Sequence, residues 1–253
     1  MPRSLLTRRR LLSSLALGGA SLLAGCDRLS QSPSFQEILH AGEWLNYKTQ
    51  RMLIGSALAR EYTAAEMSPD FRTNGNTRPR SDDWNRLAAR NFADYRLAVD
   101  GLVEASQSFS LAGLRNMPSR TQITRHDCVE GWSSIGQWTG VPLAAVLDRV
   151  RLSPNARFVV LHCADDFSGT PYYESIDLVD AFHPQTILAY GMNGDVLPVG
   201  HGAPLRLRVE RQLGYKHAKF IMGVEAVESL AGIGGGRGGF WEDAGNYHWY
   251  AGV

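Results

Sequence analysis

Short strand-like segments separated by turn residues constrain the fold of this chain more than any other feature. Six segments carry the apolar or alternating pattern of strands, at 95–103, 120–128, 158–163, 187–192, 205–210 and 220–227. Phe158–Cys163 is almost continuously apolar, which is typical of a strand buried on both faces. Helical patterns are short, at 110–117 and at 141–150. Many short strands with few helices predict an α+β domain with a mixed sheet.

Composition and charge limit the size of the domain and the partners to consider. The chain has 253 residues, of which 44% are hydrophobic and 20% are charged, which is ordinary for a globular protein with a sizeable core. The formal net charge of +1 gives no reason to expect nucleic-acid binding or a polybasic membrane patch. We expect residues 66–253 to form one large domain.

The first 26 residues carry an export pattern. Thr7–Leu12 reads Thr-Arg-Arg-Arg-Leu-Leu, a twin-arginine pattern, and the apolar run after it is too short and too rich in Gly and Ser to span a bilayer. Leu23–Cys26 resembles a lipoprotein signal-peptidase box, in which Cys26 becomes the lipidated first residue. We expect residues 1–26 to direct export of the folded protein to the periplasm and a lipid anchor on the inner membrane. A plain secretory signal with three arginines is the alternative.

Residues 27–65 connect this leader to the domain. Residues 27–34 are polar and predict a tether. Apolar residues recur at helical spacing from Phe35 to about Arg60, which predicts one or two amphipathic helices that pack on the domain.

Two irregular stretches lie at the two ends of the predicted domain. Residues 66–83 contain turn residues throughout, and a long irregular stretch in a compact domain is usually functional or disordered. The arginines and asparagines of this stretch either hydrogen-bond a polar ligand or lie on a surface loop. Residues 232–253 are rich in glycine and then in aromatic residues, and we expect them to wrap the domain and cover one face.

A single cysteine, Cys128, lies in the polar and aromatic stretch Thr124–Ser133. If Cys26 is used by the anchor, Cys128 and Cys163 remain in an oxidising compartment, either as a disulfide or with at least one thiol kept for chemistry. A thiolate among basic neighbours is a soft metal ligand or a nucleophile. No CxxC or HxxxH spacing supports a zinc site, and nothing in the sequence ties a histidine to Cys128 as in a cysteine hydrolase.

A second cluster combines glycines with cations in residues 198–208 and 213–220. Glycines let the backbone approach a ligand closely, and Arg206, Lys216 and Lys219 are suited to a phosphate, which arginine binds in a bidentate way. A solvated strand face is the alternative.

Several separated motifs, in this order, resemble the molybdopterin domain of the sulfite oxidase family. They are similar also to the catalytic subunit of periplasmic methionine sulfoxide reductases. The resemblance runs from about Phe71 to Glu228 and rests on Cys128–Ser133, Trp138–Leu143, Leu188–Tyr190 before Met192–Gly194, Leu197–Pro198, His201–Leu207 and Gly214–Lys219.

The resemblance implies a role for each matching residue. Cys128 would be the protein's thiolate ligand to molybdenum, and Arg125 is the nearest candidate in sequence for the substrate pocket. The resemblance implies contacts to the molybdopterin cofactor from Arg72, Asn74, Asn76, Cys163, His201, Arg206, His217, Ala218 and Lys219.

The resemblance also implies a function. The chain would be a molybdopterin-dependent oxidoreductase that transfers an oxygen atom to or from a small oxyanion or sulfoxide. The sequence has no CxxCH haem motif and no Cys-rich cluster, so electrons would pass to or from a separate protein, which we expect to be a haem-containing or quinone-linked membrane or periplasmic partner. The alternatives are an exported binding lipoprotein with a Cys128–Cys163 disulfide and no activity, and a thiol hydrolase.

Overall fold

The computed structural model describes residues 32–253, which fall into two units. One unit ends at Gly55 and the other runs from Ser56 to Val253. The predicted twin-arginine signal and lipobox lie outside the described residues. Within residues 32–253, no helix combines the length and the apolar character that a membrane span requires.

The first unit contains one helix, α2 (Pro33–Ile54). Ser32 caps its N-terminus, because the side-chain oxygen accepts a hydrogen bond from the backbone N–H of Phe35 at 3.3 Å. Gly55 follows the last turn with a φ of 52° and ends the helix. The predicted helical stretch is therefore a single helix that ends before Arg60. The residues after it belong to the second unit, where the backbone N–H of Ala59 donates to Gln185 Oε1 at 2.7 Å.

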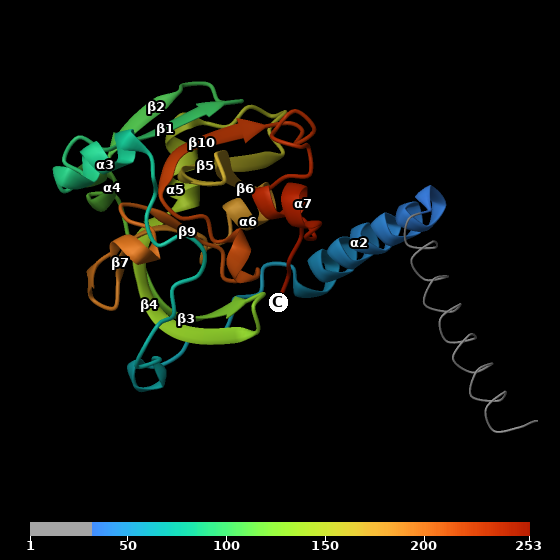
Figure 1. Cartoon of the computed structure of the whole chain (residues 1–253), viewed down its shortest axis with the longest axis horizontal. Coiled ribbons are helices and arrows are strands. Elements are labelled where there is room, and N and C mark those ends of the chain that lie inside the picture. Colours follow the sequence, from blue (N-terminus) through green and yellow to red (C-terminus); the bar gives the residue numbers. More distant parts are fainter. Residues whose placement is uncertain (1–31) are drawn as a thin grey trace, which may run out of the picture. The chain divides into compact units, whose positions relative to one another are not determined.

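The second unit is an α+β fold with two five-stranded sheets. The first sheet has the order β2-β1-β10-β5-β6, and β1 and β10 run parallel while the other neighbours run antiparallel. It is therefore a mixed sheet, as the sequence predicts, and it occupies the upper part of Figure 1. Its strands are β1 (Arg96–Gly101), β2 (Gln107–Ser110), β5 (Phe158–Phe167), β6 (Thr170–Asp177) and β10 (Ile221–Val227).

The second sheet is antiparallel and has the order β3-β4-β7-β8, with β9 paired to β7. Cys128 is the last residue of β3 and pairs with Trp132, the first residue of β4. Gly131 takes a φ of 85° in the turn between them, which favours glycine. The strands are β3 (Arg120–Cys128), β4 (Trp132–Pro142), β7 (Ile187–Met192), β8 (Asp195–Val196) and β9 (Arg206–Arg208).

The core contains apolar side chains from both sheets and from one face of a helix. In α5 (Leu143–Val150), the buried residues are Leu143, Val146, Leu147 and Val150, which is the spacing of one helical face. They pack with apolar side chains from both sheets. The other helices are α3 (Asp82–Ala89), α4 (Leu111–Arg115), α6 (Leu178–Ala181) and α7 (Phe240–Gly245), with the 3-10 turns η1 (Ala64–Glu66), η2 (Val199–His201) and η3 (Gly214–Lys216).

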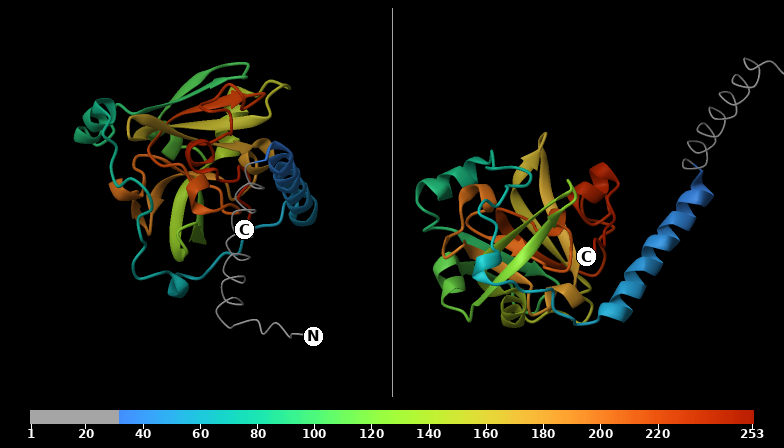
Figure 2. Two further views of the ribbon diagram at one scale, coloured as in Figure 1. Left: turned by 45° about the vertical axis from the view of Figure 1, so that its right-hand side comes forward. Right: turned by 90° about the horizontal axis from the view of Figure 1, so that it is seen from below.

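The C-terminal segment wraps the domain, as the sequence predicts. It carries α7, which lies beside β6 (Figures 1 and 2), and Gly239 pairs with Glu174 of β6. Further on, the carbonyl of Ala251 accepts a hydrogen bond from the backbone N–H of Leu213 at 2.8 Å. The segment is thus fixed beside η3.

Candidate active site

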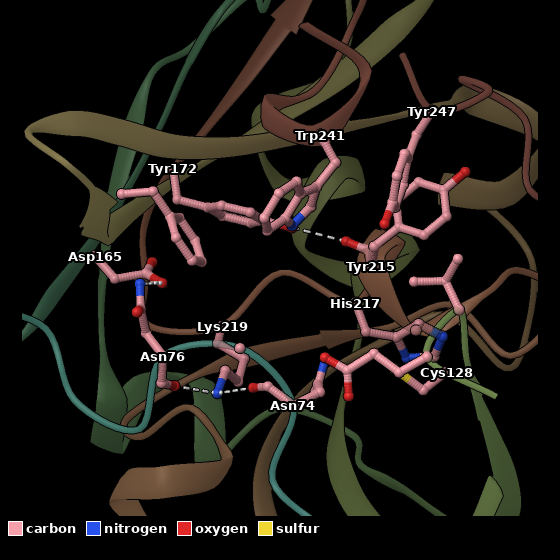
Figure 3. A pocket seen from close by; sticks show the side chains of 15 residues that line it. Asn74, Asn76, Cys128, Asp165, Tyr172, Tyr215, His217, Lys219, Trp241 and Tyr247 are labelled. Atoms are coloured by element: carbon pink, nitrogen blue, oxygen red, sulfur yellow. Dashed lines mark hydrogen bonds between the residues drawn. The ribbon is translucent and has the colours of Figure 1, made fainter. Parts of the chain in front are cut away.

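A cavity of about 130 Å³ lies where five separate segments meet (Figure 3). These are the loop after η1, the end of β3, the β5–β6 hairpin, the segment from η3 to β10, and the C-terminal segment. The residues that line it are Asn74, Gly75, Asn76, Cys128, Val129, Glu130, Asp165, Phe167, Tyr172, Gly214, Tyr215, His217, Lys219, Trp241 and Tyr247.

Alternation along β3 decides which of its side chains reach this site. Thr124, His126 and Cys128 are on the buried face, whereas Arg125 is on the other face. Arg125 donates to Asp127 Oδ2 at 2.9 Å and its side chain is 52% exposed. It has no place in the cavity lining. A residue three positions before Cys128 on a strand faces the opposite way, so Arg125 lies outside this cavity, and its role in the substrate pocket stays a prediction.

Both described cysteines are free thiols. The Cys128–Cys163 disulfide of the alternative interpretation is therefore wrong for this structure. Burial raises the pKa of the Cys128 thiol, and the ring of His126 is hydrogen-bonded to Arg208 at 3.1 Å instead of to that thiol. An activated cysteine nucleophile needs a low pKa or an adjacent base, so the geometry gives no support to a hydrolase.

Two buried arginines, Arg206 and Arg208, lie on β9 outside the cavity lining. Arg208 pairs with Glu210 at 2.5 Å. Arg206 is fully buried and packs over the Trp138 ring at 4.7 Å, with one nitrogen donating to the carbonyl of His201 at 3.0 Å. Its Nε and Nη2 atoms have no hydrogen-bond partner in the part of the chain that the structure describes. A buried guanidinium with two free donors is suited to an anion that the protein itself does not supply.

Three histidines lie beside these arginines and are neutral. Burial, followed by the charge of Arg208, lowers the pKa of His126 and that of His217 well below the usual value. Burial, followed by the charge of Arg206, lowers the pKa of His201 to about 4. Within residues 32–253, His126 Nε2, His201 Nδ1 and His217 Nδ1 are buried without a partner. The cluster thus offers several unmatched polar atoms in a cationic environment.

Lys219 fixes the loop that closes the site. Its ammonium donates to the carbonyls of Asn74 at 2.7 Å and Gly200 at 3.0 Å, and also to the carbonyl of Asn76. Burial, followed by the charge of Arg206, lowers the pKa of Lys219 to about 7. The Asn76 side chain donates to Asp165 Oδ2 at 3.1 Å. The predicted residues Asn74 and Asn76 therefore lie in one loop, which the predicted residue Lys219 holds through hydrogen bonds.

Of four other residues predicted to contact the cofactor, one lines the cavity and three do not. His217 lines the cavity, whereas Ala218 beside it is buried outside the lining. Arg72 lies over the Trp132 ring at 5.5 Å, also outside the lining. Cys163 lines a second cavity on the other side of Tyr172.

Sequence reasoning missed Asp165 and an aromatic wall. Asp165 is 4% exposed, and its Oδ1 has no partner among the described residues. It lies within the register shift between His162 and Asp166 of β5, so simple strand alternation counted from Cys163 does not predict which way its side chain points. The missed aromatic residues are Phe167, Tyr172, Tyr215, Trp241 and Tyr247. The sequence signal for Trp241 and Tyr247 was the aromatic content of the C-terminal segment, and Tyr215 lies within the Gly214–Lys219 motif.

Comparison with known proteins identifies relatives of this chain. Residues 85–231 match the family described as oxidoreductase molybdopterin binding domain. The chain is 38% identical over 240 residues to the "Putative protein-methionine-sulfoxide reductase subunit YedZ1" of Azospira oryzae, covering 94% of this chain and 85% of that protein. It is 32% identical over 235 residues to the "Protein-methionine-sulfoxide reductase catalytic subunit MsrP" of Xanthomonas axonopodis pv. citri, covering 88% and 70%. The sulfane dehydrogenase SoxCD from Paracoccus pantotrophus aligns with a TM-score of 0.49 at 23% identity, over 54% of this chain and 39% of that chain.

Proposed function

The chain belongs to the oxidoreductase molybdopterin-binding domain family, and is therefore a molybdenum-dependent oxidoreductase of the sulfite oxidase type; from this premise we propose that it reduces methyl sulfoxides, with methionine sulfoxide as the representative substrate. The names of its relatives suggest this substrate. The observation that carries the site assignment is the Cys128 thiol in a cavity near Arg206, whose buried Nε and Nη2 atoms have no hydrogen-bond partner among the described residues.

The residues of the site fit molybdopterin, which carries an anionic phosphate and a dithiolene. The free Nε and Nη2 donors of Arg206 suit the phosphate or another anionic oxygen. His201 Nδ1, His217 Nδ1 and Asp165 Oδ1 offer further unmatched hydrogen-bonding atoms, and Cys128 supplies the soft thiolate ligand. When bound, the cofactor supplies two-electron oxygen-atom transfer, and the protein supplies orientation and electrostatics.

The reaction balances with an external electron donor. One methyl sulfoxide, two electrons and two protons give one methyl thioether and one water, so the S–O bond breaks and sulfur is reduced. Within the chain, Lys219 holds the loop at Asn74 and Asn76 against the site. The electrons come from a separate carrier, for which we propose a haem-containing or quinone-linked partner.

Localisation belongs to the same proposal. The twin-arginine pattern before Leu11 suits export after the cofactor is inserted, and Cys26 suits a lipid anchor on the periplasmic face of the inner membrane. Mass spectrometry of the protein purified from membranes tests this. A mature N-terminus at a lipidated Cys26 is expected, and an unprocessed or differently cleaved chain contradicts it.

Metal analysis and a dye assay test the function. Protein matured in a host that makes the cofactor is expected to contain molybdenum and to oxidise a reduced artificial dye when methionine sulfoxide is added. Cys128→Ser is expected to keep the fold, as judged by circular dichroism, and to lose turnover. Absence of molybdenum from competently matured protein, or full activity of Cys128→Ser, contradicts the assignment.

A further inference from the structure

The C-terminal segment contributes two rings to the cavity although it lies beyond residues 85–231, which match the family. Trp241 and Tyr247 stack on each other, with centroids 5.8 Å apart and an interplanar angle of 25°. Tyr215 meets Tyr247 edge-on at 4.9 Å, and Phe167 meets Trp241 at 5.1 Å. Figure 3 shows Trp241, Tyr215 and Tyr247 along one side of the cavity, with Cys128 below them.

Two contacts to η3 connect this part of the C-terminal segment to the domain. Glu242, next to Trp241, pairs with the buried Lys216 at 2.6 Å. The Tyr215 hydroxyl donates to the carbonyl of His248, next to Tyr247, at 2.6 Å. Trp241 and Tyr247 are therefore each followed in sequence by a residue that is bonded to η3.

The charges around the cavity favour an uncharged ligand at this wall. Among the described lining residues, the side chains able to carry positive charge are Lys219 and His217. The Lys219 ammonium is used by three carbonyls, and burial keeps His217 neutral by lowering its pKa. Among these lining residues a sulfite-like oxyanion finds no free cation, since Arg72 and Arg206 lie outside the lining, whereas sulfur and S-methyl groups make favourable contacts with aromatic rings.

We propose that Trp241 and Tyr247 are specificity-determining residues that bind the S-methyl end of a sulfoxide substrate. This inference rests on the proposed sulfoxide reductase function and goes beyond it by assigning substrate choice to the C-terminal segment. The rings contact the substrate through its uncharged end, which leaves the sulfoxide oxygen directed away from the wall.

Steady-state kinetics of the molybdenum-loaded protein test this assignment. Trp241→Leu and Tyr247→Leu are each expected to raise KM for methionine sulfoxide about 3- to 10-fold, the range of a lost sulfur–aromatic contact. Because the contact is made by substrate and transition state alike, kcat per molybdenum atom should change little. Trp241→Phe, which keeps an aromatic face, should retain most of the affinity.

Trp249→Leu is the matched control. Trp249 is in the same segment, but its indole donates to Ser175 at 2.9 Å and the ring lies outside the cavity, so KM should stay at the wild-type value. Unchanged KM in both Trp241→Leu and Tyr247→Leu overturns the inference, as does a fall in kcat with KM unchanged. Wild-type protein that carries molybdenum but reduces no sulfoxide instead overturns the proposed function. Quenching of Trp241 fluorescence by the thioether product, abolished in Trp241→Leu, is the expected second readout.

Discussion

Lys216 joins the cavity to the C-terminal segment, and replacing it tests how the site is held together. It stands between Tyr215 and His217, which line the cavity. Its side chain is fully buried with those of Glu174 and Glu242. The cluster thereby connects β6, η3 and α7 through one ammonium and two carboxylates.

The size of the effect follows from this burial. Lys216→Met keeps much of the side-chain volume but leaves two buried carboxylates without a cation, and breaking a buried ion pair costs about 3–5 kcal/mol. For a domain of this size, each kcal/mol lowers the unfolding temperature by about 2–4 °C. The variant should therefore melt roughly 6–20 °C below the wild type at neutral pH.

The loss should depend on pH with a definite sign. Burial, followed by the charge of Glu242, already raises the pKa of Glu174 well above its usual value. A carboxyl group with a raised folded-state pKa stabilises the fold while it is protonated, and this contribution is lost as pH rises above the unfolded value of about 4.3. Without the Lys216 ammonium, about one more of the two buried carboxyl groups should have a raised pKa in the folded state. The stability difference between wild type and Lys216→Met should grow by up to about 1.4 kcal/mol per pH unit above that value.

Urea unfolding followed by fluorescence at pH 5 and pH 7.5 measures both effects. The matched control is Lys48→Met, which removes a lysine of α2 that packs near Trp44 and Tyr47 and should leave the stability of the second unit unchanged. A loss below about 1 kcal/mol for Lys216→Met, against the 3–5 kcal/mol of a broken buried pair, would refute the reasoning. An equal loss at both pH values would refute the assigned carboxylate titration.

Three further substitutions separate positioning, thiol chemistry and cofactor charge. Gly214→Ala would place a Cβ 2.4 Å from His126 Nε2. It should lower the free energy of unfolding by about 1–3 kcal/mol and lower the molybdenum content. In the control Gly232→Ala the new Cβ meets nothing within 4 Å, so calorimetry should show no change in stability. Cys163→Ala should keep molybdenum and turnover, because its thiol lies outside the cavity. Arg206→Met should raise the unfolding temperature of cofactor-free protein by removing a buried charge whose Nε and Nη2 atoms have no partner among the described residues, yet abolish molybdenum retention.

The strands that sequence predicts well are those with apolar faces. The prediction for 187–192 coincides with β7, and that for 220–227 differs from β10 only by including Phe220. β4 and β6 were missed as strands because small or polar residues occupy their buried faces, such as Ser134 in β4 and Glu174 in β6. Burial of such residues depends on partners elsewhere in the chain, which a local pattern does not contain.

The site shows the same division between local and distant information. The period of a strand was sufficient to place Arg125 opposite Cys128, although proximity in sequence suggested a shared pocket. Asp165 required knowledge of the bulge in β5. Trp241 required the tertiary contact that brings the C-terminal segment to η3, more than a hundred residues after Cys128. No periodicity in the aromatic segment indicates that contact.

In the function that we propose, cofactor binding and substrate choice rest on different physics. Arg206 and His217 lie within the family-matched residues and act through buried charge and unmatched polar atoms, which an anionic cofactor satisfies. Trp241 and Tyr247 lie outside that range and act through short-range ring contacts. Because ring contacts fall off within a few ångströms while buried charges act over longer distances, changes in the C-terminal segment should alter which substrate is bound without releasing the cofactor.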